Sequence, residues 1–170
     1  MPGQTIATCG GYEMVEVGPR IYFIDRGTGA HAIALFVLGL LVGLTGINGV
    51  VQLSLGNVIA GLIIGGVGGL FAAVFVLVLR ARRRRLALRW DQHAPLAFID
   101  RQTGSAHDGA GQPIAPLAQV AFAPVFQIAS SSQALAMKLP GGEIVIARGS
   151  PFSGSIDDFT DALRARGLRA

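Results

Sequence analysis

The sequence predicts a membrane protein of the α+β class, with a two-helix antiparallel transmembrane hairpin and a small cytoplasmic β-rich domain closed by a C-terminal amphipathic helix. Two stretches without Asp, Glu, Lys or Arg, at residues 30–51 and 58–79, predict the helices. A run of arginines directly after the second stretch predicts their orientation. Alternating apolar and polar residues in the range 95–170 predict the strands.

Composition agrees with a membrane element joined to one modest soluble part. Of the 170 residues 51% are hydrophobic and 14% charged, a low charged fraction for a soluble protein. The net charge of +4 depends on one arginine cluster, without which the chain would be slightly acidic. Cys9 is the only cysteine, which excludes an intramolecular disulfide. The bias toward Arg, Ala and Gly favours a bacterial source.

Each uncharged stretch is long enough to cross a bilayer. A helix rises ~1.5 Å per residue, so ~20 residues span a hydrocarbon core of ~30 Å. A helix buried in a soluble core would still carry polar positions on one face, and residues 61–79 carry none. Residues 52–57 are too few for anything but a tight turn on the extracytoplasmic side. The two helices are therefore expected to be antiparallel neighbours.

Arginines near the helix ends predict the topology. Arg20 and Arg26 precede the first helix, the arginine run follows the second, and the turn carries no basic residue. Basic loops remain in the cytoplasm. We therefore expect a multi-pass protein of the bacterial inner membrane, with both termini cytoplasmic.

Small residues recur at helical spacing in both stretches. Helices in lipid associate through close contact between small side chains. A glycine-zipper face is therefore expected, which either packs the two helices on each other or contacts a partner or a second copy. The first helix contributes Gly39, Gly43 and Gly46, and the second contributes Gly61, Gly65, Gly69 and Ala73.

Few polar side chains lie within the two stretches. Intramembrane ionisable residues mark ion and proton pathways, so their absence argues against such a pathway. Thr45 and Asn48 are expected to form interhelical hydrogen bonds or to cap the turn, and His31 is expected at the membrane boundary.

Residues 80–94 form a basic juxtamembrane segment. Basic side chains near an anionic membrane surface contribute ~1 kcal/mol each. Since a membrane surface explains the basic run, no nucleic-acid partner is expected. Trp90, the only tryptophan, is expected to be an interfacial anchor. The predicted lipid contacts are Arg80, Arg82, Arg83, Arg84, Arg85, Arg89 and Trp90.

The range 95–170 reads as strands followed by one helix. Strands are expected at residues 96–101 and, as a hairpin, at 133–139 and 143–148, with a loop at 107–111. Residues 117–129 are apolar but contain Pro124, which predicts two short strands or one bulged strand. The helix is expected to begin at the N-cap Ser155 and to end at Gly167. Its apolar face consists of Ile156, Phe159 and Leu163, and Asp157 and Asp158 lie in its first turn.

The N-terminal residues 1–29 also contain strand patterns, at 12–17 and 20–25. Residues 23–29 (FIDRGTG) closely match residues 98–104 (FIDRQTG). The match is either a coincidence of two similar strand ends, or a sign that the N-terminal strands join the same cytoplasmic sheet. In the second case the membrane hairpin is an insertion in one β-rich domain.

Six or seven strands followed by a C-terminal helix resemble a pleckstrin-homology-like barrel, of the kind found beside transmembrane helices in bacterial membrane proteins. The resemblance covers residues 95–170 and lies in the architecture, without a diagnostic motif. It implies a module that binds lipid or peptide and assigns no functional residue.

Catalytic and metal-binding patterns are missing from the sequence. It contains no P-loop, no dinucleotide-binding fingerprint and no paired-ligand metal motif. The histidines are His31, His93 and His107; Asp91 and Asp100 flank His93, but a strand and a proline intervene, and His107–Asp108 is expected to be a solvated loop dipeptide. The serine run at residues 130–132 has no positioned base nearby. We therefore expect no enzyme, no cofactor and no bound metal.

These features favour a non-catalytic accessory or scaffold subunit of a larger bacterial membrane protein complex. The expected partners are membrane lipids and other membrane protein subunits, or further copies of the chain. One alternative is a membrane-tethered lipid- or peptide-binding module, and another is a homo-oligomeric pore.

Overall fold

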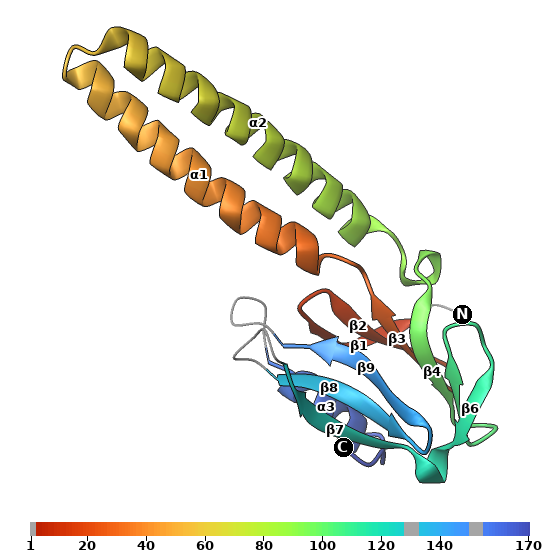
Figure 1. The fold of residues 1–170 in the computed structure, drawn as a ribbon. Coiled ribbons are helices and arrows are strands. Elements are labelled where there is room, and N and C mark those ends of the chain that lie inside the picture. The colour runs from red at the N-terminus through yellow and green to blue at the C-terminus, as the bar shows by residue number, and fades with distance from the viewer. Residues whose placement is uncertain (1–2, 128–132, 150–154) are drawn as a thin grey trace. The chain divides into compact units, whose positions relative to one another are not determined.

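The computed structural model describes residues 3–127, 133–149 and 155–170, which form two compact units (Figure 1). The hairpin unit comprises Thr28–Ala87, and the β-rich unit comprises Met1–Gly27 and Leu88–Ala170. The prediction of two long apolar helices and a β-rich part is confirmed.

The hairpin unit consists of two helices, α1 (Gly29–Ser54) and α2 (Val58–Ala87). Both are long and apolar enough to cross a membrane. Helix α2 continues beyond Leu79 because the arginines that follow are good helix formers. The turn contains Gly56 in a left-handed conformation with φ of 82°. The side-chain amide of Asn57 donates a hydrogen bond from Nδ2 to Gln52 Oε1 at 2.8 Å.

The larger sheet of the β-rich unit has six antiparallel strands that follow one another in chain order. The N-terminal strands at 12–17 and 20–25 are confirmed. The first strand and the sixth were not predicted, and the expected loop at 107–111 was wrong for His107 and Asp108, which lie in the fifth strand. The strands are β1 (Gln4–Cys9), β2 (Tyr12–Val17), β3 (Arg20–Asp25), β4 (Pro95–Asp100), β5 (Ser105–Asp108) and β6 (Pro113–Pro116).

The N-terminal strands join the same sheet as the later ones, as the second alternative predicted. Strand β3 pairs with β4, with Tyr22 opposite Phe98. The whole hairpin unit is therefore inserted between two strands that are neighbours in one sheet. The matching segments also share a hydrogen bond from a backbone amide to the aspartate two residues earlier. Asp25 accepts a hydrogen bond from the Gly27 amide at 2.7 Å, and Asp100 accepts one from the Gln102 amide at 2.9 Å.

The smaller sheet contains β7 (Ala121–Phe126), β8 (Gln133–Leu139) and β9 (Gly142–Arg148). The β8–β9 hairpin is confirmed. Strand β7 runs through Pro124 in unbroken register, so the expectation of two strands or a bulge was wrong. Proline is tolerated there because β7 is an edge strand. Residues 128 and 129 of the predicted stretch lie outside the described residues.

Two short 3-10 helices complete the connections, at Trp90–Gln92 and Leu117–Gln119. Within the described ranges, the strands form two separate antiparallel sheets and no closed barrel. The barrel implied by the pleckstrin-homology-like resemblance is therefore not formed by these strands.

Helix α3 (Asp157–Arg164) confirms the predicted C-terminal amphipathic helix. Phe159 and Leu163 are fully buried in the core shared by both sheets, and Ile156 is 6% exposed. The predicted N-cap was wrong by one residue: Ile156 occupies that position and forms no side-chain cap hydrogen bond. The Ser155 hydroxyl lies just before it and accepts a hydrogen bond from the Asp157 backbone amide at 3.3 Å. Gly167 has a φ of 74° and follows the helix, as predicted.

An ion-pair cluster fixes the end of this helical segment to the larger sheet. Arg166 Nε donates to Glu16 Oε2 at 3.0 Å, and Arg101 forms a second ion pair with the same carboxylate. Burial alone would raise the pKa of Glu16, but the hydrogen bonds and charges of Arg166 and Arg101 outweigh it and lower the pKa below its ordinary value of 4.5.

Replacing Glu16 with glutamine is expected to lower the free energy of unfolding by about 1–2 kcal/mol at neutral pH. Because the pKa is lowered in the folded chain, the carboxylate stabilises the fold above its unfolded pKa and loses this effect as the pH falls through the folded pKa. The difference between wild type and variant should therefore shrink below pH 4.5. Urea unfolding in detergent, followed by Trp90 fluorescence, measures it. A difference that stays constant into acid would contradict this assignment.

Candidate functional site

The two helices of the hairpin unit pack along a seam with a seven-residue repeat. Residues one heptad apart on each helix are turned away from solvent. A repeat of this kind is typical of left-handed helix pairs. These positions are His31, Leu38, Thr45 and Gln52 on α1, and Gly61, Gly68, Phe75 and Arg82 on α2.

Glycines allow the closest approach along this seam. A β-carbon added to Gly49 would lie 3.3 Å from the Gly65 backbone nitrogen. One added to Gly68 would lie 2.8 Å from Thr45 Oγ1, and one added to Gly61 would lie 2.6 Å from Leu53 Cγ. A side chain at any of these three positions would therefore require a neighbouring group to shift.

The predicted glycine-zipper face divides into two parts. Gly61 lies in the seam, and a β-carbon on Gly39 would be 3.8 Å from Phe75. At the other predicted positions an added side chain would point away from the partner helix: β-carbons on Gly43, Gly46, Gly65 and Gly69 would meet nothing within 4 Å, and Ala73 is exposed. The backbones of Gly65 and Gly46 nevertheless border the seam, 3.3 Å and 3.7 Å from β-carbons added to Gly49 and Gly68.

The division has a geometric cause. Each four-residue step turns about 40° past a full helical turn, so a ridge at this spacing rotates away from a straight partner. The seam instead follows the heptad repeat. Gly49 and Gly68, which the sequence analysis missed, are the residues that a search for seven-residue spacing from Gly61 and Val42 would have found.

Replacing Gly49 with leucine is expected to destabilise the hairpin by about 1–3 kcal/mol, because the new side chain meets the backbone of α2 and cannot move it aside. Gly43→Leu adds the same side chain at an open position and is the matched control, with a change within about 0.5 kcal/mol. Thermal loss of the helical circular dichroism signal in detergent measures both. Equal effects of the two variants would show that the seam does not lie at Gly49.

The polar side chains of α1 are satisfied within their own helix. The Thr45 hydroxyl donates to the Leu41 carbonyl at 2.6 Å, and the side-chain amide of Asn48 donates from Nδ2 to the Leu44 carbonyl at 2.8 Å. The expected interhelical hydrogen bonds are replaced by these local ones. The donor groups of both side chains are therefore satisfied without a partner helix.

The predicted lipid-contact residues fall into two groups. Arg80, Arg82, Arg83, Arg84 and Arg85 lie in α2, where none forms an ion pair with any described residue. We call these five residues the arginine collar. Arg89 instead pairs with Asp91 at 3.1 Å, and the Trp90 ring packs 5.6 Å from Tyr22. Trp90 is thus a packing residue of the β-rich unit.

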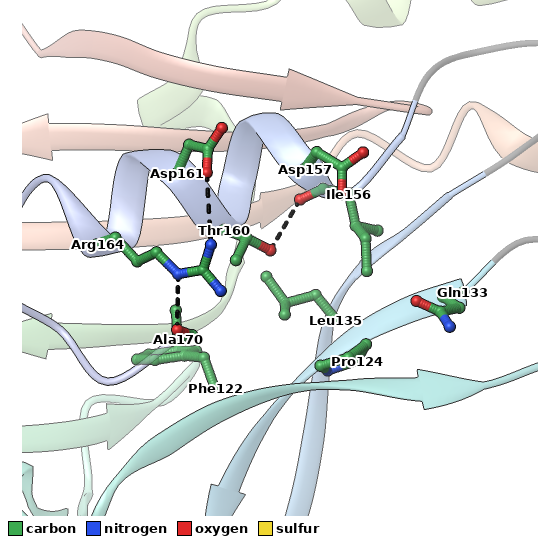
Figure 2. A pocket seen from close by; sticks show the side chains of 10 residues that line it. All are labelled: Phe122, Pro124, Gln133, Leu135, Ile156, Asp157, Thr160, Asp161, Arg164 and Ala170. Carbon is green, nitrogen blue, oxygen red and sulfur yellow. Dashed lines mark hydrogen bonds and ion pairs between the residues drawn. The ribbon is translucent and has the colours of Figure 1, made fainter.

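A cavity of about 310 Å³ lies between α3 and the smaller sheet (Figure 2). Apolar side chains from β7 and β8, including Phe122 and Leu135, line its inner part. Its rim is polar, but Arg164 is already bound, donating to the Ala170 carbonyl at 2.9 Å (Figure 2). This cavity was not predicted, because its lining comes from segments that are distant in sequence: β7, β8, α3 and the C-terminal residues.

One serine–histidine contact occurs in the larger sheet. Ser105 Oγ lies 2.9 Å from His107 Nε2, and Gly111 O lies 3.1 Å from His107 Nδ1. Such a pair could in principle activate a nucleophile. Here the His107 ring is stacked on Phe98 at 4.6 Å, and neither residue of the pair lines the cavity of Figure 2. The contact therefore reads as part of the strand's own packing.

Among the described residues no group of three or more His, Cys, Asp or Glu is placed to hold a metal ion. Cys9 is buried, and its thiol donates to the Arg148 carbonyl at 3.6 Å. Burial, together with the nearby charge of Asp158, raises the pKa of this thiol, so it is poorly suited to act as a nucleophile.

Comparison with protein-family models, characterised proteins and solved structures gives no match to this chain, so its function has to be inferred from its own residues.

Proposed function

We propose that this chain is a non-catalytic accessory or scaffold subunit of a bacterial membrane protein complex. In this proposal the hairpin unit crosses the inner membrane and the β-rich unit lies in the cytoplasm. The observation that carries it is the exposed apolar surface of the hairpin. The most apolar windows of α1 and α2 are only 0% and 6% buried.

Large aliphatic side chains cover this surface. Ile33 is 69% exposed, Ile47 68% and Ile59 77%. Apolar surface left in water costs about 25 cal/mol per Å², and two helices with such faces would aggregate in buffer. Lipid covers such faces without a protein partner, which favours a membrane position over a soluble one.

The topology rests on charge. Arg20 pairs with Asp100 and Arg26 pairs with Glu13, so both arginines before α1 are neutralised within the folded β-rich unit. The arginine collar has no such partners and provides the stronger orientation signal. It favours a cytoplasmic end for α2 and therefore an extracytoplasmic turn.

The scaffold role follows from what the two surfaces offer. The outward glycines of the hairpin, such as Gly43 and Gly69, permit a second transmembrane helix to approach closely. The β-rich unit supplies hydrogen-bonded polar groups and a cavity of about 310 Å³, without a positioned nucleophile in that cavity or a metal cluster among the described residues. Holding partners together suits these features better than catalysis.

Topology is tested by cysteine labelling of the full chain. In a Cys9→Ala background, Ser54→Cys marks the turn and Gln92→Cys marks the segment after α2, both at exposed positions. A membrane-impermeant maleimide should label position 54 in intact spheroplasts and position 92 only after permeabilisation. Labelling of both positions from the same side, or recovery of the chain in the soluble fraction without detergent, would reject the membrane hairpin.

The complex is tested by purification from the native membrane in mild detergent. The expected result is a particle larger than the chain, with co-purifying membrane proteins identified by mass spectrometry. A strictly monomeric chain without partners would reject the subunit role and leave the membrane topology standing.

A further inference from the structure

We propose that the arginine collar is a binding site for the phosphate groups of anionic phospholipids, with Arg82 as its most selective member. This inference rests on the membrane placement proposed above. It narrows the predicted lipid contact to phosphate groups, to five arginines and to one selective residue among them.

The first argument is the lack of counter-ions. No Asp or Glu occurs between residues 28 and 87, so the hairpin unit contains no carboxylate of its own. Elsewhere in the chain most basic side chains are paired, as Arg20 is with Asp100 and Arg166 with Glu16. The collar thus holds five positive charges that no described residue neutralises, and anions must come from its surroundings.

The second argument is the arrangement of these charges around the helix. Successive residues turn about 100°, so positions 80, 82, 83, 84 and 85 point in all directions around the α2 axis. A helix lying flat on a membrane would gather its basic residues on one side. A complete ring suits a helix that passes through the headgroup layer and meets lipid phosphates on every side.

The position of the ring along α2 agrees with this. The apolar stretch ends at Leu79, and Arg85 lies about 9 Å farther along the axis at 1.5 Å per residue. The polar interface adds roughly 5–8 Å on each side of the hydrocarbon core. The collar therefore begins within the headgroup layer when the apolar stretch fills the core, and Arg85 lies at the outer edge of that layer.

Arg82 differs from the other four members. It occupies the seam position one heptad after Phe75, and its Nε is inaccessible to solvent and has no hydrogen-bond partner in the described part of the chain. A shielded donor without a partner costs free energy. A phosphate cannot reach the shielded Nε itself, but Arg82 as a whole is only partly buried, and the terminal nitrogens of a planar guanidinium can contact phosphate oxygens at two points.

The test uses the delipidated full chain in detergent, titrated with phosphatidylglycerol or phosphatidylcholine and followed by native mass spectrometry. We expect preferential retention of phosphatidylglycerol, and about fivefold weaker retention in Arg82→Gln, since one basic residue at a membrane surface is worth that factor. Arg89→Gln removes the same charge from a residue already paired with Asp91 and is the matched control, with unchanged retention.

Two further measurements identify the source of the ligand and distinguish a loss of binding from misfolding. Inorganic phosphate, added as a competitor, should not displace the lipid; displacement would assign the site to free phosphate. Arg82→Lys keeps the charge but loses the two-point contact, so its retention should fall between those of wild type and Arg82→Gln. The comparison of Arg82→Lys with the wild type remains decisive if the glutamine variant does not fold, which the helical circular dichroism signal reports.

Two results would overturn the inference. One is equal retention of both lipids by the wild type, and the other is equal losses in Arg82→Gln and Arg89→Gln. In contrast, a chain that stays dispersed without detergent would overturn the membrane placement itself. The two failures are therefore distinguishable.

Discussion

Replacing Phe159 with alanine is expected to lower the free energy of unfolding of the β-rich unit by about 3–5 kcal/mol. The Phe159 side chain is fully buried and belongs to the core formed by both sheets and α3. Its removal leaves a cavity that the surrounding strands can fill only in part, because core residues are already close-packed. Chemical unfolding of the full chain in detergent measures the loss.

The chain offers a matched control for this substitution. Phe126 is 82% exposed at the end of β7, so Phe126→Ala removes the same side chain with a change within about 0.5 kcal/mol. Trp90, the only tryptophan, packs on Tyr22 and reports on the unit being tested. Similar losses in the two variants would mean that α3 is not packed into the core.

The features that were predicted correctly are those whose signal is contained in one continuous segment. The apolar stretches of α1 and α2 exceed the length needed to span a bilayer. The acidic first turn, apolar face and terminal glycine of α3 are likewise local signals. The β8–β9 hairpin is marked by the turn residues between its strands.

The missed features arise from pairing between distant segments. Strands β5 and β6 have four residues each and too few apolar side chains to show a period, so the neighbouring strands determine their conformation. Proline in β7 is acceptable only because that strand lies at an edge, which the sequence does not state.

The candidate sites follow the same rule. The arginine collar lies within residues 80–85, and its contact with lipid stays a prediction. Its separation from Arg89 and Trp90 depends on contacts with Asp91 and Tyr22. To predict which glycines lie in the seam of the hairpin, the four-residue and the seven-residue spacing have to be distinguished. Only the pairing of α1 with α2 decides between them.

A buried ion pair at the point where the hairpin unit is inserted carries the other large expected effect. Glu13 in β2 is 5% exposed and accepts a hydrogen bond from Arg26 Nε at 2.7 Å. The same guanidinium donates to the Leu88 carbonyl at 3.0 Å. Arg26 shortly precedes α1 and Leu88 directly follows α2, so one side chain joins the segments that enter and leave the insertion.

Replacing Glu13 with alanine is expected to cost about 3–5 kcal/mol of unfolding free energy, because it leaves a largely buried guanidinium without its counter-ion. Glu143→Ala breaks the pair with Lys138, whose two side chains are 44% and 45% exposed, and should cost at most about 1 kcal/mol. Urea unfolding followed by Trp90 fluorescence compares the two variants.

A double substitution separates the cost of an unpaired charge from the loss of packing. Glu13→Leu combined with Arg26→Met replaces both charges by apolar side chains of similar volume, so most of the stability should return. Because the Leu88 carbonyl would lose its partner in that variant, recovery should be incomplete. If Glu13→Ala costs no more than Glu143→Ala, or if the double variant is less stable than Glu13→Ala, the pair does not hold the two ends of the insertion together.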